Sequence, residues 1–162
     1  IQLPGVAVPC MLSSERNRTE ADKAEPLPDK LRPWDEEDVV VLAKMLYGEA
    51  GNVLSDTEKA ACVWCVLNRV DLYCSDITTE TTKPHQFVGY RETNPVREDL
   101  RALCLDVLER WYREKQGETD VGRVLPPDYT FFSGDGVENF FRNAFEAPYD
   151  LWDWSLLSPY DS

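Results

Sequence analysis

Hydrophobic residues recur with the period of an α-helix along three parts of the chain. In the first, apolar positions continue from Val39 to Ala50 after a run of four acidic residues that begins at Asp35. Asp35 is a residue type that caps helices, and the acids after it suit the positive end of the helix dipole. Gly51 suits the left-handed conformation that ends many helices. The pattern predicts a helix from Asp35 to Glu49 or Ala50.

A second apolar segment follows Ser55. The tetrapeptide Ser55-Asp56-Thr57-Glu58 has the spacing of a capping box, in which the first and last side chains bond each other's backbone N–H groups. Apolar residues from Ala60 to Leu67 then occupy almost every side of a helix. We expect this helix to be the central buried element and to end at the polar pair Asn68 or Arg69.

The third apolar segment covers one face only. Asn94 followed by Pro95 is typical of a helix start, and Gly117 lies just beyond the expected end near Lys115. The apolar stripe consists of Val96, Leu100, Leu103, Cys104, Val107, Leu108, Trp111 and Tyr112. This spacing predicts a long helix with one buried face. Between the second and third helices, the threonine-rich and proline-containing segment 74–90 predicts a loop with room for a short strand, and no helix.

Aromatic residues dominate the last third of the chain. Tyr129 and Phe131 alternate as in a strand, and Gly134-Asp135-Gly136 predicts a turn. Segment 149–155 places further aromatic rings beside carboxylates. Such rings stack equally well on sugars or in a small core. Together the segments predict a mainly α fold of the α+β kind, with a small β element.

The 162 residues are enough for one domain. Residues 1–33 contain five prolines and no sustained apolar period, which predicts a flexible N-terminal linker or tail. Residues 34–162 form the predicted domain. The sequence begins with Ile1 rather than Met. We therefore expect a processed product whose export signal has been removed, and hence a secreted or cell-envelope protein.

The charge balance excludes some partners. There are 17 basic and 30 acidic residues, giving a formal net charge of −13. Because an acidic surface repels phosphate backbones, nucleic acid is not expected as a partner, whereas a neutral or zwitterionic glycan is compatible. The longest apolar run, Ala60 to Leu67, is far shorter than the roughly 20 residues that span a bilayer. No membrane span is predicted.

Two residue types invite a metal hypothesis. Cys62-x-x-Cys65, with Cys74 and Cys104, supplies four thiols of the kind that bind zinc. The alternative is that they are small core residues, because the first pair would lie inside an apolar helix. Cys10 makes the cysteine count odd, so at least one thiol has no partner within the chain. The single histidine, His85, follows a proline and is expected on the surface.

Glu49 is the main catalytic candidate. Leu42, Leu46 and Glu49 are spaced i, i+4 and i+7, so the carboxyl group shares the apolar stripe of its helix. An acid among apolar groups has a raised pKa and holds a proton near neutral pH, as a general acid must. The alternative is a glutamate at a helix end whose stem packs while its carboxylate reaches solvent.

Two segments carry a resemblance to a known family. Leu42–Gly51, followed by Ala60–Val70, resembles the first two helices of the spore-cortex-lytic or cell wall hydrolase family. In that family one helix ends in Tyr/Trp-(Gly/Ala)-Glu-Ala and the next ends in Val-Leu-Asn-Arg-Val. Weaker similarity extends the match to residues 38 to about 145, through Gln86-Phe87, Asn94-Pro95 and Tyr129-Thr130-Phe131-Phe132.

The resemblance implies a lysozyme-like helical domain that acts on the glycan strands of peptidoglycan, with Glu49 as the catalytic acid. It implies no metal or organic cofactor, and we expect a monomer. Many family members have Arg-Gly-Glu after the Glu-Ala, where this chain has Gly51-Asn52-Val53. The acid at the end of that tripeptide is therefore missing from this chain.

One acid is enough for a lytic transglycosylase, in which the muramic acid 6-hydroxyl attacks its own anomeric carbon. This mechanism is the main hypothesis. The residues expected to line the cleft are Tyr47, Gln86, Phe87, Tyr90, Tyr129 and Phe131. One alternative is hydrolysis aided by Asp56, Glu58 or Asp135. Another is a non-catalytic cell-envelope module that binds glycans or proteins.

Overall fold

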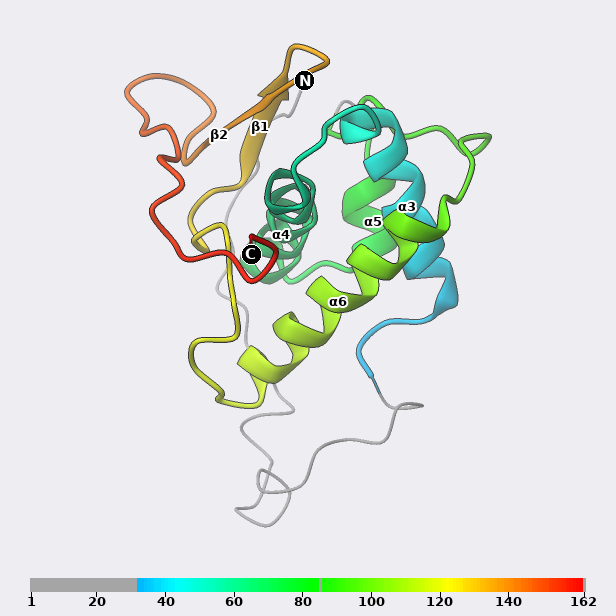
Figure 1. Cartoon of the computed structure of the whole chain (residues 1–162), viewed down its shortest axis with the longest axis horizontal. Coiled ribbons are helices and arrows are strands. Elements are labelled where there is room, and N and C mark those ends of the chain that lie inside the picture. Colours follow the sequence, from blue (N-terminus) through cyan, green and yellow to red (C-terminus); the bar gives the residue numbers. More distant parts are fainter. Residues whose placement is uncertain (1–31, 85, 162) are drawn as a thin grey trace.

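The computed structural model describes residues 32–84 and 86–161. Most of the predicted linker at residues 1–33, with Cys10 and His85, lies outside the described residues. The elements are α3 (Glu36–Ala50), α4 (Asp56–Tyr73), α5 (Ile77–Thr82), α6 (Glu98–Lys115), β1 (Phe131–Gly134) and β2 (Asn139–Arg142) (Figure 1). The predicted mainly α class with a small β element is confirmed.

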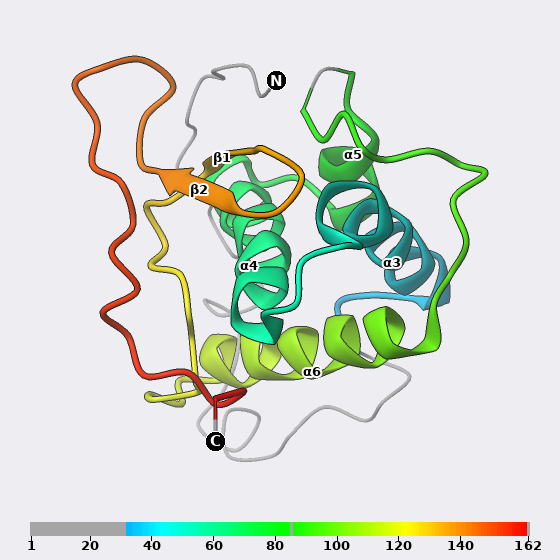
Figure 2. The same ribbon diagram turned by 45° about the horizontal axis from the view of Figure 1, so that its top comes forward.

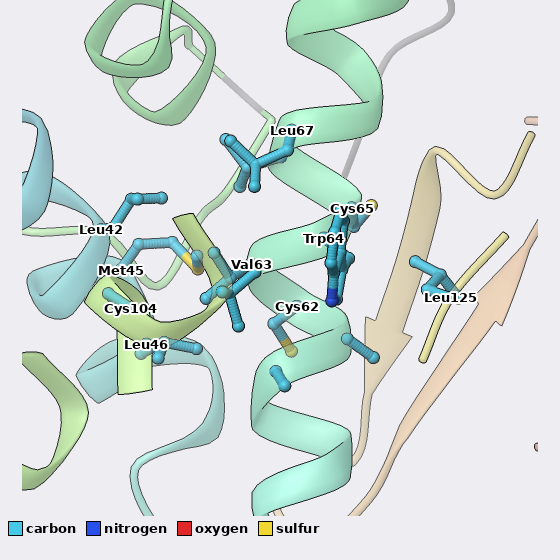
Figure 3. Packing of buried hydrophobic residues seen from close by; sticks show 14 of the residues in the cluster. Leu42, Met45, Leu46, Cys62, Val63, Trp64, Cys65, Leu67, Cys104 and Leu125 are labelled. Atoms are coloured by element: carbon cyan, nitrogen blue, oxygen red, sulfur yellow. The ribbon is translucent and has the colours of Figure 1, made fainter. Parts of the chain in front are cut away.

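Helix α4 is the central element, as predicted. It lies between the β1–β2 hairpin on one side and α3 and α5 on the other, while α6 crosses below it (Figure 2). Side chains from α3 meet Val63 on one face of α4, and Leu125 lies beside Trp64 on another (Figure 3). Both Val63 and Trp64 are fully buried. The apolar run of α4 therefore forms the centre of the core.

Helix α3 begins and ends as predicted, but the glycine after its last residue, Ala50, has a different conformation from the one expected. Asp35 and Asp38 form the reciprocal capping box at its start. Gly51 at its end is right-handed, with φ −61° and ψ −28°, so the predicted left-handed conformation is wrong. Glycine is suited to this place for a steric reason, since a Cβ on Gly51 would lie 2.4 Å from the Tyr47 carbonyl oxygen.

Helix α4 continues to Tyr73, four or five residues beyond the predicted end at Asn68 or Arg69. The polar pair Asn68 and Arg69 does not end it, because both side chains are buried and bonded to other segments. Asn68 donates to the Tyr129 carbonyl at 2.9 Å. The helix ends instead at Cys74, which is left-handed with φ 50°.

A short helix, α5, lies within the segment predicted as a loop, so that prediction is wrong. Asp76 caps it by accepting the Thr79 N–H at 2.8 Å. The hydroxyls of Thr81 and Thr82 donate to the carbonyls four residues earlier, which satisfies them inside the helix. Burial of Ile77 then fixes α5 against the core.

Helix α6 has the predicted single buried face and the predicted end at Lys115. It starts at Glu98 rather than Pro95, and the helix-start prediction at Asn94 is therefore wrong. The Asn94 amide bonds the Lys44 and Gly89 carbonyls instead, so it does not cap a helix.

The two strands form an antiparallel hairpin in which Phe132 pairs with Phe141. Asp135 closes its turn by accepting the N–H groups of Val137 and Glu138. Gly136 has φ 93°, which glycine adopts without strain. The chain after β2 returns along the hairpin through the Trp152 N–H, which donates to the Phe141 carbonyl at 2.8 Å.

Two further expectations concern membranes and metals. No helix within the described residues has the length and apolar character needed to cross a bilayer. Cys62, Cys65 and Cys104 are buried in the core, and burial raises the pKa of the Cys62 thiol well above its ordinary value. Within residues 32–84 and 86–161, no three acidic, cysteine or histidine side chains converge as a metal site would require.

Candidate active site

A cleft of about 510 Å³ lies where the end of α3, the loop after α5 and the β1–β2 hairpin meet. Its lining residues are Gly48, Glu49, Gln86, Val88, Phe132, Ser133, Gly134, Gly136 and Arg142. Glu49 is the one carboxylate among these described residues. The acid selected by helix periodicity therefore lies in a cleft.

Glu49 is half-buried at the wall of this cleft. Its stripe partners Leu42 and Leu46 are fully buried, as the periodicity predicts. Burial raises the pKa of the Glu49 carboxyl, while a hydrogen bond from the Gly89 N–H (2.9 Å to Oε1) and the positive charge of Arg91 oppose that rise. The net effect favours the protonated carboxyl, which is the form that can donate a proton.

Two glycines allow the loop after α5 to reach Glu49. A Cβ on Gly48 would lie 1.7 Å from the Gly89 carbonyl oxygen, and a Cβ on Gly89 would lie 2.6 Å from the Gly48 carbonyl carbon. Any side chain at either position would therefore separate the two backbones. Their contact places the Gly89 N–H against the carboxyl group.

Asn94 fastens this loop to α3. Its side-chain amide nitrogen donates to the Gly89 carbonyl at 2.9 Å and to the Lys44 carbonyl at 3.0 Å. The two acceptors belong to the loop and to the helix that carries Glu49. One side chain thereby fixes the distance between them.

Replacing Gly48 by alanine is expected to lower any activity that depends on Glu49 by about 100-fold, because a displacement of about 1 Å at a reacting group has an effect of this size. The added Cβ pushes the Gly89 backbone away, so its N–H no longer bonds Glu49. Activity and melting temperature measured together check this. Asn52→Ala, an exposed residue just past the same helix, is the control. An unchanged rate in Gly48→Ala would show that the contact is dispensable.

The β1–β2 hairpin forms the wall of the cleft across from Glu49. Hydrogen bonds join this hairpin and the residue before it to α4. Glu58, at the start of α4, is buried and accepts the Asn139 N–H of β2. Burial raises the pKa of the Glu58 carboxyl, and the hydrogen bonds from Asn139 oppose the rise. Arg69 donates to the Thr130 carbonyl just before β1 at 3.2 Å. These bonds fix the wall that carries Phe132 and Ser133.

Of the six residues expected to line the cleft beside Glu49, Gln86 does so, and it is buried. Tyr47 is outside the lining and 39% exposed, because residues two apart on a helix point in different directions. Phe87 is buried behind the wall, with its ring centroid 5.7 Å from that of Phe132. Neither Tyr47 nor Phe87 is therefore among the residues that line this cleft.

The other three aromatic candidates also lie outside the lining. Tyr90 packs against the core. The Tyr129 ring packs on Trp152 with centroids 5.4 Å apart. Phe131 packs on Phe145 at 5.7 Å. The next residue of β1, Phe132, lines the cleft instead.

The three candidates for a second acid are all engaged elsewhere. Asp56 is exposed and pairs with Lys59 at 3.2 Å. Glu58 is buried beneath the hairpin. Asp135 bonds the backbone of its own turn, and those bonds lower the pKa of its carboxyl. None of the three lines the cleft.

Sequence reasoning did not single out several lining residues, among them Val88, Phe132, Ser133 and Arg142. Phe132 and Ser133 are consecutive in β1 and both line the cleft, so the two-residue alternation of a strand does not identify them. Arg142 follows the second aromatic cluster, and nothing in its local pattern marks it.

Comparison with protein-family models, curated proteins and solved structures finds no match to this chain.

Proposed function

We propose that this protein cleaves peptidoglycan glycan strands between N-acetylmuramic acid and N-acetylglucosamine as a lytic transglycosylase, using Glu49. The observation that carries the proposal is a single carboxyl group in a cleft, with its pKa raised by burial. In this proposal residues 34–162 form a lysozyme-like catalytic domain. The resemblance of the Glu-Ala and Leu-Asn-Arg-Val segments to cell wall hydrolases supports it.

The proposed reaction uses Glu49 twice. The protonated carboxyl first donates its proton to the glycosidic oxygen, and the bond from that oxygen to the muramic acid anomeric carbon breaks. The 6-hydroxyl of the same sugar then attacks the anomeric carbon, and the Glu49 carboxylate takes the hydroxyl proton. The products are a 1,6-anhydromuramic acid end and a free 4-hydroxyl, and Glu49 is again protonated.

The position of the other acids favours this reaction over hydrolysis. A glycoside hydrolase uses two carboxyl groups, about 5 to 5.5 Å apart for retention and about 6.5 to 9.5 Å apart for inversion. Here the cleft lining supplies Glu49 alone. An internal hydroxyl nucleophile removes the need for a base that positions water.

The polar and aromatic lining suits a sugar polymer. The exposed Ser133 hydroxyl offers a hydrogen bond to acetamido or hydroxyl groups, and Gln86 and Phe132 line the same cleft. In this proposal the protein acts outside the cytoplasmic membrane, as a secreted or envelope-associated monomer.

Mass spectrometry of soluble fragments released from purified peptidoglycan tests the function. We expect fragments with 1,6-anhydro ends, 18 Da lighter than the corresponding reducing ends because no water is added. Reducing ends would show hydrolysis and would direct attention to Glu58 and Asp135. Retention on insoluble peptidoglycan without any release would identify a binding module instead.

A further inference from the structure

Most arginines of this acidic protein are paired with carboxylates. Nine arginines lie within residues 32–84 and 86–161. Those within 4 Å of a carboxylate are Arg32, Arg69, Arg97, Arg101, Arg110, Arg113 and Arg123. Arg91 and Arg142 are the two without such a partner in this part of the chain. With a net charge of −13, unpaired guanidinium groups are the exception here.

One of these two arginines lines the Glu49 cleft, and the other follows the loop beside it. Arg142, at the end of β2, lines the cleft. Arg91 follows the loop that contacts Glu49, and its charge is close enough to lower the pKa of that carboxyl. Arg91 donates to the Val88 and Tyr90 carbonyls, so its position is fixed by its own loop. One guanidinium group therefore lines the cleft, and a second is close enough to act on Glu49.

The Arg142 guanidinium is held in place while part of it remains open to a ligand. Its Nε donates to the Ala144 carbonyl at 3.1 Å. The rings of Phe131, Phe145 and Tyr149 lie around it, with centroids 5.4 to 5.9 Å from its central carbon. Its Nη1 and Nη2 bond no acceptor within the described residues and are not buried. Two donors of a rigid fork are thus available.

This arrangement suits a carboxylate. The guanidinium fork matches two carboxylate oxygens, and such charge-assisted pairs are stronger than neutral hydrogen bonds. Aromatic neighbours restrict the side chain before binding, so less conformational entropy is lost when a ligand arrives. A neutral glycan would leave the charge of Arg142 without a counter-charge.

We propose that Arg142 binds a carboxylate of the substrate and makes the cleft selective for acidic glycans over neutral ones. This inference rests on the proposed function, because it concerns the same cleft. In peptidoglycan the carboxylate comes either from the lactyl group of muramic acid or from the peptide attached to it. Both present the same chemistry to the fork.

Equilibrium binding to three soluble glycans of equal length tests this assignment. They are peptide-free glycan with lactyl carboxylates, the same glycan with peptides, and a chito-oligosaccharide that has no carboxylate. The full chain carrying Glu49→Gln is used, so that no ligand is cleaved. We expect Arg142→Gln to weaken binding of at least one carboxylated glycan by about 10- to 100-fold and to leave the chito-oligosaccharide unaffected. Arg142→Lys, which keeps the charge but not the fork, should lose less.

The control is Arg101→Gln, which removes an arginine from the surface of α6, where it pairs with Glu36. A loss confined to the peptide-free glycan identifies the lactyl carboxylate, and a loss confined to the substituted glycan identifies the peptide. Equal loss for all three ligands, or no loss for any, overturns the inference. If carboxylate selectivity holds but the unmutated protein releases no fragments, the proposed cleavage fails while the carboxylate site stands.

Discussion

Replacing Glu49 by glutamine is expected to lower the rate of glycan cleavage by about 100- to 10,000-fold, the range over which general acid–base groups contribute. The amide has nearly the same shape and its oxygen can still accept the Gly89 N–H, but it has no acidic proton to give. The measurement is the rate at which soluble fragments leave purified peptidoglycan. A glutamine variant with full activity would contradict the proposed role of Glu49.

Stability measurements on the same variant separate catalysis from structure. Because burial raises the pKa of Glu49 above its usual 4.5, the charged form destabilises the folded state. The contribution of the neutral carboxyl is fully present below about pH 4.5 and is lost as the pH rises through the higher folded pKa. Glu49→Gln should therefore melt at a higher temperature than the parent near pH 7 and at a similar temperature near pH 4. A lower melting temperature at pH 7 would indicate a structural role.

Glu58→Gln is the matched control, because Glu58 is the other carboxyl group of the described chain whose pKa burial raises. The glutamine oxygen can still accept the Asn139 N–H, so the hairpin wall should stay in place. We expect cleavage within a few-fold of the parent rate. A loss as large as that of Glu49→Gln would reveal a second catalytic carboxyl and favour hydrolysis.

The core helices were predictable because their apolar periods are local properties of the sequence. The cap at Asp35 and the apolar residues on all sides of α4 can both be recognised from neighbouring residues in the sequence, without knowledge of any distant contact. The errors occurred where polar residues find distant partners. Asn68 and Arg69 resembled a helix end in the sequence but bond segments about 60 residues away.

The site was predictable in part for the same reason. Helix period located Glu49, and similarity to a family element located Gln86. The remaining lining depends on how the hairpin lies against α4, which local sequence does not determine. Phe132, Ser133 and Gly134 are consecutive in β1 and all line the cleft, which the alternation of Tyr129 and Phe131 did not indicate. Arg142 is distinguished by its place in the cleft lining together with its lack of a carboxylate neighbour, and no local pattern reveals either property.

Replacing Arg69 by methionine is expected to destabilise the protein by about 3 to 5 kcal/mol, the usual effect of removing one partner from a buried ion pair. Arg69 and Glu80 are 1% and 0% exposed, and the Arg69 Nε lies 3.2 Å from the Glu80 carboxylate. The variant leaves that carboxylate buried with Lys83 alone and removes the bond to the Thr130 carbonyl. Thermal unfolding should show a melting temperature lower by roughly 10 to 20 °C.

Two further variants decide whether the buried charge causes this loss. Arg101→Met removes a pair that lies on the surface, so it should change stability by less than about 1 kcal/mol. Adding Glu80→Leu to Arg69→Met removes the stranded carboxylate and should restore part of the lost stability. A double variant less stable than Arg69→Met would contradict this explanation. It would show that the packing lost with the Glu80 side chain matters more than the unpaired charge of its carboxylate. The double variant still lacks the Arg69 bond to the Thr130 carbonyl just before β1, so restored stability would show the effect of the buried charge separately from that bond.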